Sequence, residues 1–253
     1  MIYDLQKAMI WKRASAYLFD FIILGIVVVG IAFGMSGLTG YDAYSEILET
    51  CYARYEQEYG TTFDLTEEDY HAMTPREQQI YAEAYEALTA DETAMHAYSM
   101  MVNLTLLITS LSTLAGYLIL EFAVPLLLGN GQTLGKKIFG VGVIRPDGVR
   151  ISTVQLFIRT VLGKYTIETM LPVLLVMMIF FGIIGLPGTI VVVGLVLTQA
   201  ILLLVHRNHA VIHDLLANTV AVDLSSQMVF DTEQDMIEYK KKISAEQAAR
   251  QSY

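Results

Sequence analysis

Four charged residues stand inside or beside long apolar runs of the sequence: Arg13, Asp20, Glu121 and Asp214. If those runs lie in a lipid bilayer, each ionised carboxylate costs about 2.5–3.5 kcal/mol unless it is paired. Such groups should therefore face protein, and carboxylates in this position mark routes for ions and protons. The chemistry that these residues indicate is the binding and release of a cation or a proton.

The spacing of the four residues suggests which of them meet. Arg13 and Asp20 are seven apart, so a helix would place them about 10 Å apart along its axis, too far to pair. Asp20 and Glu121 lie at similar depth and could share a proton or a cation, because like charges brought close raise one pKa. Alternatively, each binds an arginine or a lysine. We expect Arg13 to pair with Asp214 in a bidentate bridge, which could be purely structural.

Three histidines near the end of the apolar region form a second candidate group. His206, His209 and His213 are spaced by three and four residues, which suits one helical face and metal ligation. A metal site normally needs a fourth ligand and supporting groups around it. Polar contact at an interface is therefore the favoured interpretation, and we predict no metal and no cofactor.

The segment Gly-Asn-Gly-Gln-Thr-Leu-Gly-Lys-Lys at 129–137 looks like a phosphate-binding loop. That motif requires Gly where Asn130 stands and Ser or Thr where Lys137 stands, so nucleotide binding is rejected. No Ser/His/Asp or Cys/His pattern indicates an enzyme. The segment remains a candidate cytoplasmic motif, with these residues: Gly131, Thr133, Gly135 and Lys136.

The composition indicates that a bilayer surrounds much of the chain. Hydrophobic residues make up 54% and charged residues 17% of the 253 residues, too apolar for an ordinary soluble globule. The net charge of −10 is uneven, because 14 acidic residues and only Arg54 and Arg76 lie between Thr39 and Ser99. This acidic balance argues against nucleic-acid binding. Cys51 is the single cysteine, so no intramolecular disulfide can form.

Four apolar stretches are long enough to cross a bilayer as helices. Residues 169–205 carry no charge and would be about 56 Å long as one helix, so we expect a turn near Gly185-Leu186-Pro187-Gly188. A re-entrant pair is the alternative to two crossings. An all-α membrane fold is predicted with spans at about 17–38, 100–128, 169–184 and 189–205.

The positions of Lys and Arg predict the orientation, because short cytoplasmic loops retain these residues. Basic residues precede the first span, separate the second and third, and follow the fourth, so both termini are expected in the cytoplasm. The acidic segment 39–99 is then an extracytoplasmic insertion. Thr66 and Thr74 look like helix caps within it, and its tyrosines are expected to pack short helices together.

Smaller elements are expected on the cytoplasmic side. Phe139–Arg145 and Val149–Ser152 indicate a β-hairpin with its turn at Pro146-Asp147-Gly148. Ser152–Tyr165 is typical of an amphipathic helix lying in the membrane interface. The segment 224–253 is expected to be a helical or disordered polar tail, after a membrane domain at 1–223.

Taken together, these segments resemble the RDD family of membrane proteins. The resemblance rests on Arg13, Asp20 and Asp214, supported by Glu121, the Gly-Gln-Thr-Leu-Gly-Lys-Lys segment and the ending His-Asp-Leu-Leu-Ala-Asn-Thr. It covers residues 8–38 and 98–223, whereas the acidic insertion has no counterpart in commoner members, and Asn218 stands where Gly is more usual. The resemblance implies a multi-pass membrane protein, with some members linked to sodium/proton antiport and others to membrane complexes.

Two functions follow from these observations. The first is a cation/proton transporter of the cell membrane, whose partners are the bilayer, monovalent cations and protons; Gly25, Gly30 and Gly34 offer close helix packing for a homodimer. The second is a non-enzymatic scaffold or assembly factor that docks a membrane protein partner through its acidic loop and basic hairpin.

Overall fold

The computed structural model of the protein describes residues 4–180, 182–205 and 210–251. The chain divides into two compact units. The larger unit contains the residues up to Val29 and those from Thr113 onward, and the smaller unit contains Gly30–Ser112. Two long helices, α1 (Ile10–Thr39) and α5 (Glu92–Tyr117), contribute residues to both units.

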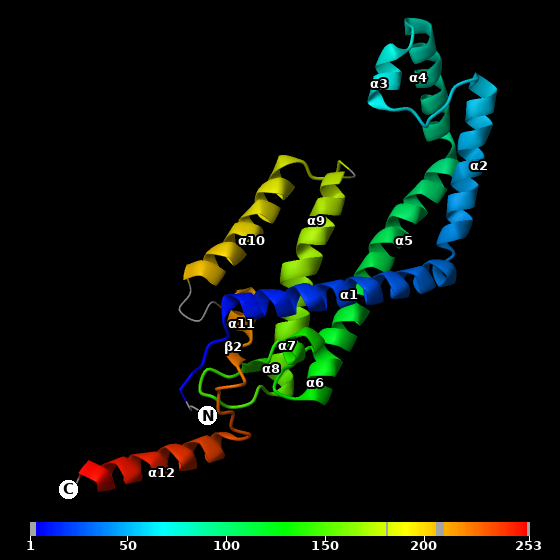
Figure 1. The fold of residues 1–253 in the computed structure, drawn as a ribbon. Coiled ribbons are helices and arrows are strands. Elements are labelled where there is room, and N and C mark those ends of the chain that lie inside the picture. Colours follow the sequence, from blue (N-terminus) through cyan, green and yellow to red (C-terminus); the bar gives the residue numbers. More distant parts are fainter. Residues whose placement is uncertain (1–3, 181, 206–209, 252–253) are drawn as a thin grey trace. The chain divides into compact units, whose positions relative to one another are not determined.

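The predicted all-α membrane fold is confirmed, because four apolar helical stretches are long enough to span a bilayer. At 1.5 Å per residue, even the shortest of them, with 20 residues, matches a hydrocarbon core of about 30 Å. The four stretches, drawn in Figure 1, are Ile10–Thr39, Glu92–Leu128, Thr153–Phe180 and Leu186–Val205.

The last two stretches form a helical hairpin, as the sequence predicts. The first arm ends in α9 (Leu171–Phe180), and α10 (Leu186–Val205) returns beside it (Figure 1). The turn is closed by hydrogen bonds from Gly182 N to Ile179 O at 3.0 Å and from Gly188 N to Gly185 O at 3.1 Å. The second arm begins at Leu186, three residues before the predicted start.

Two of the long helices contain π-helical segments. Within Glu92–Leu128, η1 (Leu118–Ala123) lies between α5 and α6 (Val124–Leu128). Within Thr153–Phe180, η2 (Ile158–Met170) joins α8 (Thr153–Phe157) to α9. The segment expected as a separate interfacial helix is therefore the first part of a continuous helix, which Ser152 caps at its start through its bond from Gln155 N at 3.2 Å.

The predicted β-hairpin is wrong in its strand pairing. Its turn forms, with Gly148 N donating to Arg145 O at 3.0 Å. However, β1 (Val141–Ile144) pairs in an antiparallel register with β2 (Val220–Asp223), about 80 positions along the chain, and only an isolated bridge links Ile144 to Arg150. Because every residue of β1 is buried, it needs an apolar partner. Three of the four residues of β2 are buried, whereas Arg150, which would pair with Ile144 in the hairpin, is exposed.

Short elements complete the larger unit around this sheet. Residues 6–8 run along the free edge of β2, with Ala8 N donating to Ala221 O at 3.2 Å. The polar tail, predicted as helical or disordered, is helical over α12 (Glu233–Gln251), and Met236 of this helix packs against Val149 and Phe230. Two further short helices of the larger unit line the site described below, α7 (Leu134–Ile138) and α11 (Ile212–Leu216).

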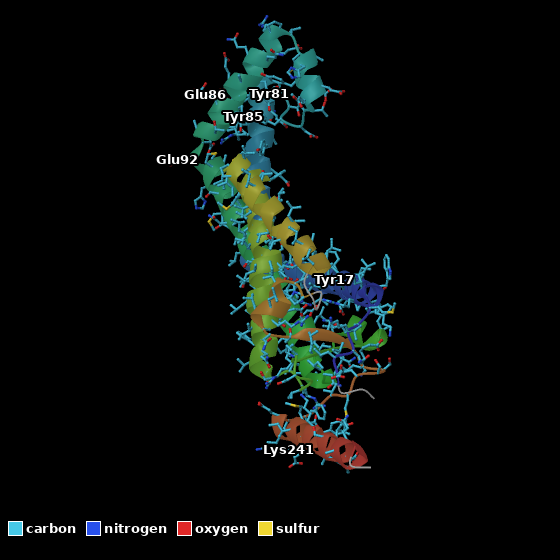
Figure 2. The ribbon with its side chains drawn as sticks, turned by 90° about the vertical axis from the view of Figure 1, so that its left-hand side faces the viewer. Tyr17, Tyr81, Tyr85, Glu86, Glu92 and Lys241 are labelled. Atoms are coloured by element: carbon cyan, nitrogen blue, oxygen red, sulfur yellow. The ribbon has the colours of Figure 1, made fainter. Side chains whose placement is uncertain are left out.

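The smaller unit is helical, and partly buried aromatic rings pack against a small core of Cys51, Leu88 and Ala94. Thr66 and Thr74 cap α3 (Glu67–Ala72) and α4 (Pro75–Ala90) with complete capping boxes, as predicted. Phe63 lies 5.4 Å from the ring of Tyr52 and 5.7 Å from that of Tyr81, and Tyr81 stacks along α4 with Tyr85 (Figure 2). The first helix of the insertion, α2 (Tyr41–Tyr59), begins after Gly40, whose φ of 74° ends α1.

Candidate functional site

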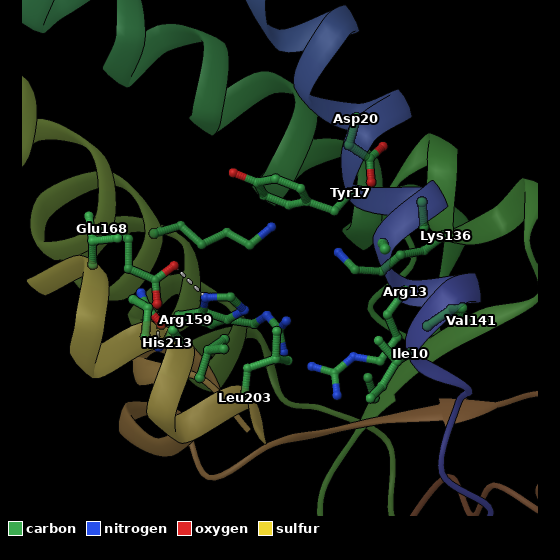
Figure 3. A pocket seen from close by; sticks show the side chains of 18 residues that line it. Ile10, Arg13, Tyr17, Asp20, Lys136, Val141, Arg159, Glu168, Leu203 and His213 are labelled. Atoms are coloured by element: carbon green, nitrogen blue, oxygen red, sulfur yellow. Dashed lines mark hydrogen bonds and ion pairs between the residues drawn. The ribbon is translucent and has the colours of Figure 1, made fainter. Parts of the chain in front are cut away.

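A cavity of about 480 Å³ lies in the larger unit, and most of the predicted charged residues border it or stand directly behind its wall. Figure 3 shows Arg13 and Lys136 on one side of this space and Arg159, Glu168 and His213 on the other. The cavity is lined by α1, α7, η2, α10, α11 and the sheet. Its polar lining residues are Arg13, Tyr17, Asp20, Lys136, Arg159, Lys164, Glu168, Gln199 and His213.

Asp214 lies behind the cavity wall and is bound by two arginines. Its side chain is only 1% exposed, and Oδ1 lies 2.6 Å from Arg159 Nη1 while Oδ2 lies 3.4 Å from Arg13 Nη2. Burial alone would raise the pKa of Asp214, but the two guanidinium groups outweigh burial and hold the pKa well below its usual range. Arg13 and Asp214 are partners as predicted, but through a single contact at 3.4 Å rather than the expected bidentate bridge, and Arg159 is the closer partner at 2.6 Å.

Glu121 is buried on η1 and is bound by lysines. Its Oε2 lies 2.5 Å from Lys164 Nζ on η2 and 3.8 Å from Lys136 Nζ on α7. Its backbone carbonyl accepts a hydrogen bond from the Thr160 hydroxyl at 2.9 Å. Of the two alternatives for Glu121, pairing with basic residues is the one that the structure adopts.

Asp20 has a different role from Glu121, because it binds the start of α7 rather than a base. Its carboxylate accepts a hydrogen bond from the Thr133 hydroxyl and another from Gly135 N at 2.7 Å. Thr133 also caps α7 through Lys136 N at 3.3 Å. Gly135 is needed here, since a Cβ at this position would collide with the backbone oxygen of Ala16. The candidate motif 131–136 therefore fastens the loop to α1.

Gly131 holds the same loop against the sheet. Its φ of +58° lies in the left-handed region that L side chains rarely adopt, and a Cβ would meet Val143 atoms at 2.9 Å. Two independent constraints therefore require glycine at this position. All four residues of the candidate motif, namely Gly131, Thr133, Gly135 and Lys136, have a contact that positions α7 or the charge cluster.

Glu168 and His213 form a further buried pair. Glu168 accepts from His213 N at 2.9 Å, and its second oxygen lies 2.6 Å from His213 Nδ1. Burial lowers the pKa of His213, so the imidazole is neutral near pH 7 and donates its Nδ1 proton to the carboxylate. His206 and His209 lie outside the described residues. Within the described ranges no group of three His, Cys, Asp or Glu could hold a metal ion.

Lys136 is the most weakly held charge of the cluster. Its Nζ has Glu121 at 3.8 Å as its ion-pair partner and makes no hydrogen bond within the described part of the chain. Burial lowers the pKa of Lys136 to about 7, with the positive charge of Lys164 acting in the same direction and Glu121 opposing it. Burial thus brings the pKa of Lys136 close to neutral pH.

Both π-helical segments place an acidic residue four positions before a proline. Pro125 follows Glu121, and Pro172 follows Glu168, at this spacing. A proline ring clashes with the carbonyl of the residue four positions earlier and cannot donate to it, so the helix widens there. At Glu121 the Thr160 hydroxyl supplies the missing donor. The backbone irregularity therefore brings the carboxylate and its partners together.

The comparison with known families decides the classification. The model described as the RDD family matches residues 7–218, a range that contains Arg13, Asp20, Glu121 and Asp214. The chain belongs to the RDD family. No curated protein and no solved structure matched the chain in the other two searches.

Sequence reasoning missed three members of the RDD charge cluster: Arg159, Lys164 and Glu168. In an α-helix, residues five apart point about 140° away from one another, so Arg159 and Lys164 do not share an α-helical face. In η2 the i→i+5 hydrogen bonding brings them to the same side. A search for glutamate four residues before proline inside an apolar run would have singled out Glu168.

Proposed function

We propose that this RDD protein exchanges protons for a monovalent cation, with sodium the first candidate, across the cell membrane through the charge cluster beside the cavity. The charge balance of the cluster carries this proposal. Among the described residues, four cationic and four anionic side chains form the cluster, and the buried imidazole of His213 is neutral. They are Arg13, Lys136, Arg159, Lys164, Asp20, Glu121, Glu168 and Asp214.

Lys136 is the proton carrier in this proposal. With Lys136 protonated the cluster is neutral, and with Lys136 deprotonated it has one net negative charge. A buried excess charge is costly, so a monovalent cation entering near Glu121 and Asp20 would restore neutrality. One proton would leave for each cation that enters. Asp20 lines the cavity together with Lys136, so the cavity provides space for such an exchange at the Asp20 side of the cluster.

Ion movement in everted membrane vesicles tests the proposal. We expect sodium to drive proton movement in vesicles containing the wild type, and we expect Asp20→Asn and Lys136→Met to abolish it. Lys137→Met is the matched control, because Lys137 is exposed and outside the cavity. The proposal would be contradicted if the Asp20→Asn protein and the wild type showed equal flux. It would also be contradicted if Lys136→Met and Lys137→Met lost flux equally.

The second candidate function is a scaffold that docks a membrane partner through the acidic insertion. The observation that favours it is a separately packed helical unit whose carboxylates face outward, such as Glu86 and Glu92 (Figure 2). Deleting residues 42–95 should then abolish co-purification of the partner and leave ion flux unchanged. Loss of flux with retained co-purification would contradict this function.

The remaining parts of the proposal concern the orientation of the protein in the membrane and its oligomeric state. We infer a non-enzymatic protein with both termini in the cytoplasm and the insertion on the opposite side, from the distribution of basic residues. A homodimer through α1 is compatible with its glycines, because a Cβ added at Gly25, Gly30 or Gly34 meets nothing within 4 Å.

A further inference from the structure

The wall of the cavity is more positive than the charge cluster as a whole. Among the residues that the structure describes, four cationic side chains line it, whereas two carboxylates do, those of Asp20 and Glu168. Both carboxylates already accept hydrogen bonds, Asp20 from the start of α7 and Glu168 from His213. Glu121 and Asp214, which balance the cluster, are not part of the lining. An anion entering the cavity would therefore meet donors.

Lys136 is the donor with the most capacity. Its ammonium group carries three N–H bonds and reaches one carboxylate oxygen at 3.8 Å. Figure 3 shows Lys136 and Arg13 extending toward the same space from α7 and α1. A phosphate or carboxylate oxygen placed between them would gain charge-assisted hydrogen bonds, which are shorter and stronger than those between neutral groups.

The rest of the lining is apolar and comes largely from two membrane helices. Ile10 and Ala14 of α1 and Val196, Ala200 and Leu203 of α10 border the cavity. The neighbouring residue Leu204 of α10 is 72% exposed, so this helix also presents an apolar face to its surroundings. At about 480 Å³ the cavity falls within the range of 300–1,000 Å³ typical of sites for small ligands.

We propose that this cavity binds the phosphate headgroup of an anionic phospholipid, with Lys136 and Arg13 as donors and the start of an acyl chain against α10. Basic pockets between membrane helices are suited to such headgroups. Free phosphate shares the headgroup chemistry but leaves the apolar wall without a partner. This inference does not rest on cation exchange, because binding requires only the cavity and its charges.

Three probes separate the sources of the anion. Delipidated full-length protein is titrated with short-chain phosphatidylglycerol, with phosphatidylcholine of the same chains, and with glycerol phosphate, and the complexes are counted by native mass spectrometry. We expect phosphatidylglycerol to bind at least tenfold more tightly than either other probe. Equal binding of the two lipids would overturn the role of charge, and equal binding of glycerol phosphate would overturn a lipid as the ligand.

Substitutions place the bound lipid in the cavity. Lys136→Met should weaken phosphatidylglycerol binding about tenfold through loss of one charge-assisted interaction, whereas Lys137→Met should leave it unchanged. Lys136→Arg keeps the charge and should retain most of the preference. Equal effects of the two methionine variants would overturn the assignment to this cavity. The comparison of probes on the wild type tests the proposal even if Lys136→Met fails to fold.

Discussion

The insertion and the RDD unit use carboxylates in opposite ways. In the insertion, Asp69 and Glu77 are exposed and cap the starts of short helices. In the RDD unit, Glu121 and Asp214 are buried and each is held by two basic side chains. The residue type is the same, and its surroundings decide whether it serves a local turn of helix or connects helices far apart in the sequence.

The interiors of the two regions also differ, because apolar contacts predominate in the insertion and ion pairs are buried in the RDD unit. In the insertion, aromatic rings pack around partly buried Phe63 against an apolar cluster, and burial of such surface stabilises a fold directly. The RDD unit instead buries ion pairs, whose attraction is offset by the cost of removing charges from water. An apolar core of equal volume would stabilise at least as well, so the retained charges favour a function for the RDD cluster.

The largest expected effect is the sidedness of chemical labelling. Cys51 is 7% exposed and packs against Leu88, so its thiol is a poor target for a topology reagent. In a Cys51→Ala background, cysteine is introduced at exposed sites by Glu86→Cys in the insertion or Lys241→Cys in α12 (Figure 2). An impermeant maleimide should label the Glu86→Cys protein in intact cells and the Lys241→Cys protein only after lysis. The reverse pattern would invert the orientation.

The next effect concerns stability. Arg159→Met leaves buried Asp214 with Arg13 at 3.4 Å as its remaining arginine partner, and breaking a buried pair costs about 3–5 kcal/mol. Arg54→Met removes the ion pair with Asp91 in the insertion, where the arginine is 55% exposed, and should lower Tm much less. Thermal unfolding in detergent measures both variants. Similar Tm shifts would show that the two regions do not differ as we infer.

The smallest effect is a pH dependence that belongs to the RDD unit. The pKa of Lys136 is lowered to about 7 from about 10.4 in an unfolded chain, so between these values the unfolded state binds more protons. Stability should therefore rise as pH increases from 7 toward 10. The charged groups that act on Lys136 from α1, η1 and η2 are Asp20, Glu121, Arg159 and Lys164.

The measurement compares Tm at pH 7 and pH 9 for the wild type and Lys136→Met. The wild type should gain stability relative to the variant, which lacks this titration, while Lys137→Met should follow the wild type. The insertion supplies no such dependence through Asp91, because hydrogen bonds from Ala94 and Thr93 hold its pKa at about 2. Parallel curves for all three proteins would show that Lys136 is charged throughout this range.

Local signals in the sequence predicted local structure well. The apolar runs, the turn before Leu186 and the capping residues Thr66 and Thr74 depend on neighbours within a few positions. The pairing of Arg13 with Asp214 was also predictable, since few other charges stand at the ends of apolar runs. These features required only hydrophobicity, length and the cost of an unpaired charge.

The remaining features depend on longer-range or irregular geometry. The pairing of β1 with β2 was not predictable from the adjacent turn at Asp147, which favours a hairpin by itself. Arg159 and Lys164 were overlooked because helical periodicity assumes 3.6 residues per turn, and η2 does not follow it. Neither the pairing of the strands nor the shared face of Arg159 and Lys164 follows from regular periodicity among neighbouring residues.

The positions of the partners of α1 in the sequence also imply a delay during biosynthesis between the synthesis of its charged side chains and their pairing. Three polar side chains of α1 or its start bind residues that are synthesised much later. Asp20 binds Gly135, 115 residues later in the chain, Arg13 binds Asp214, 201 residues later, and Lys12 binds Asp223, 211 residues later. At roughly 5–20 residues per second, the ribosome needs on the order of 10–40 seconds to supply the last two. The charges of α1 are therefore made well before the residues that neutralise them, and until then the aqueous phase or the membrane interface has to solvate them.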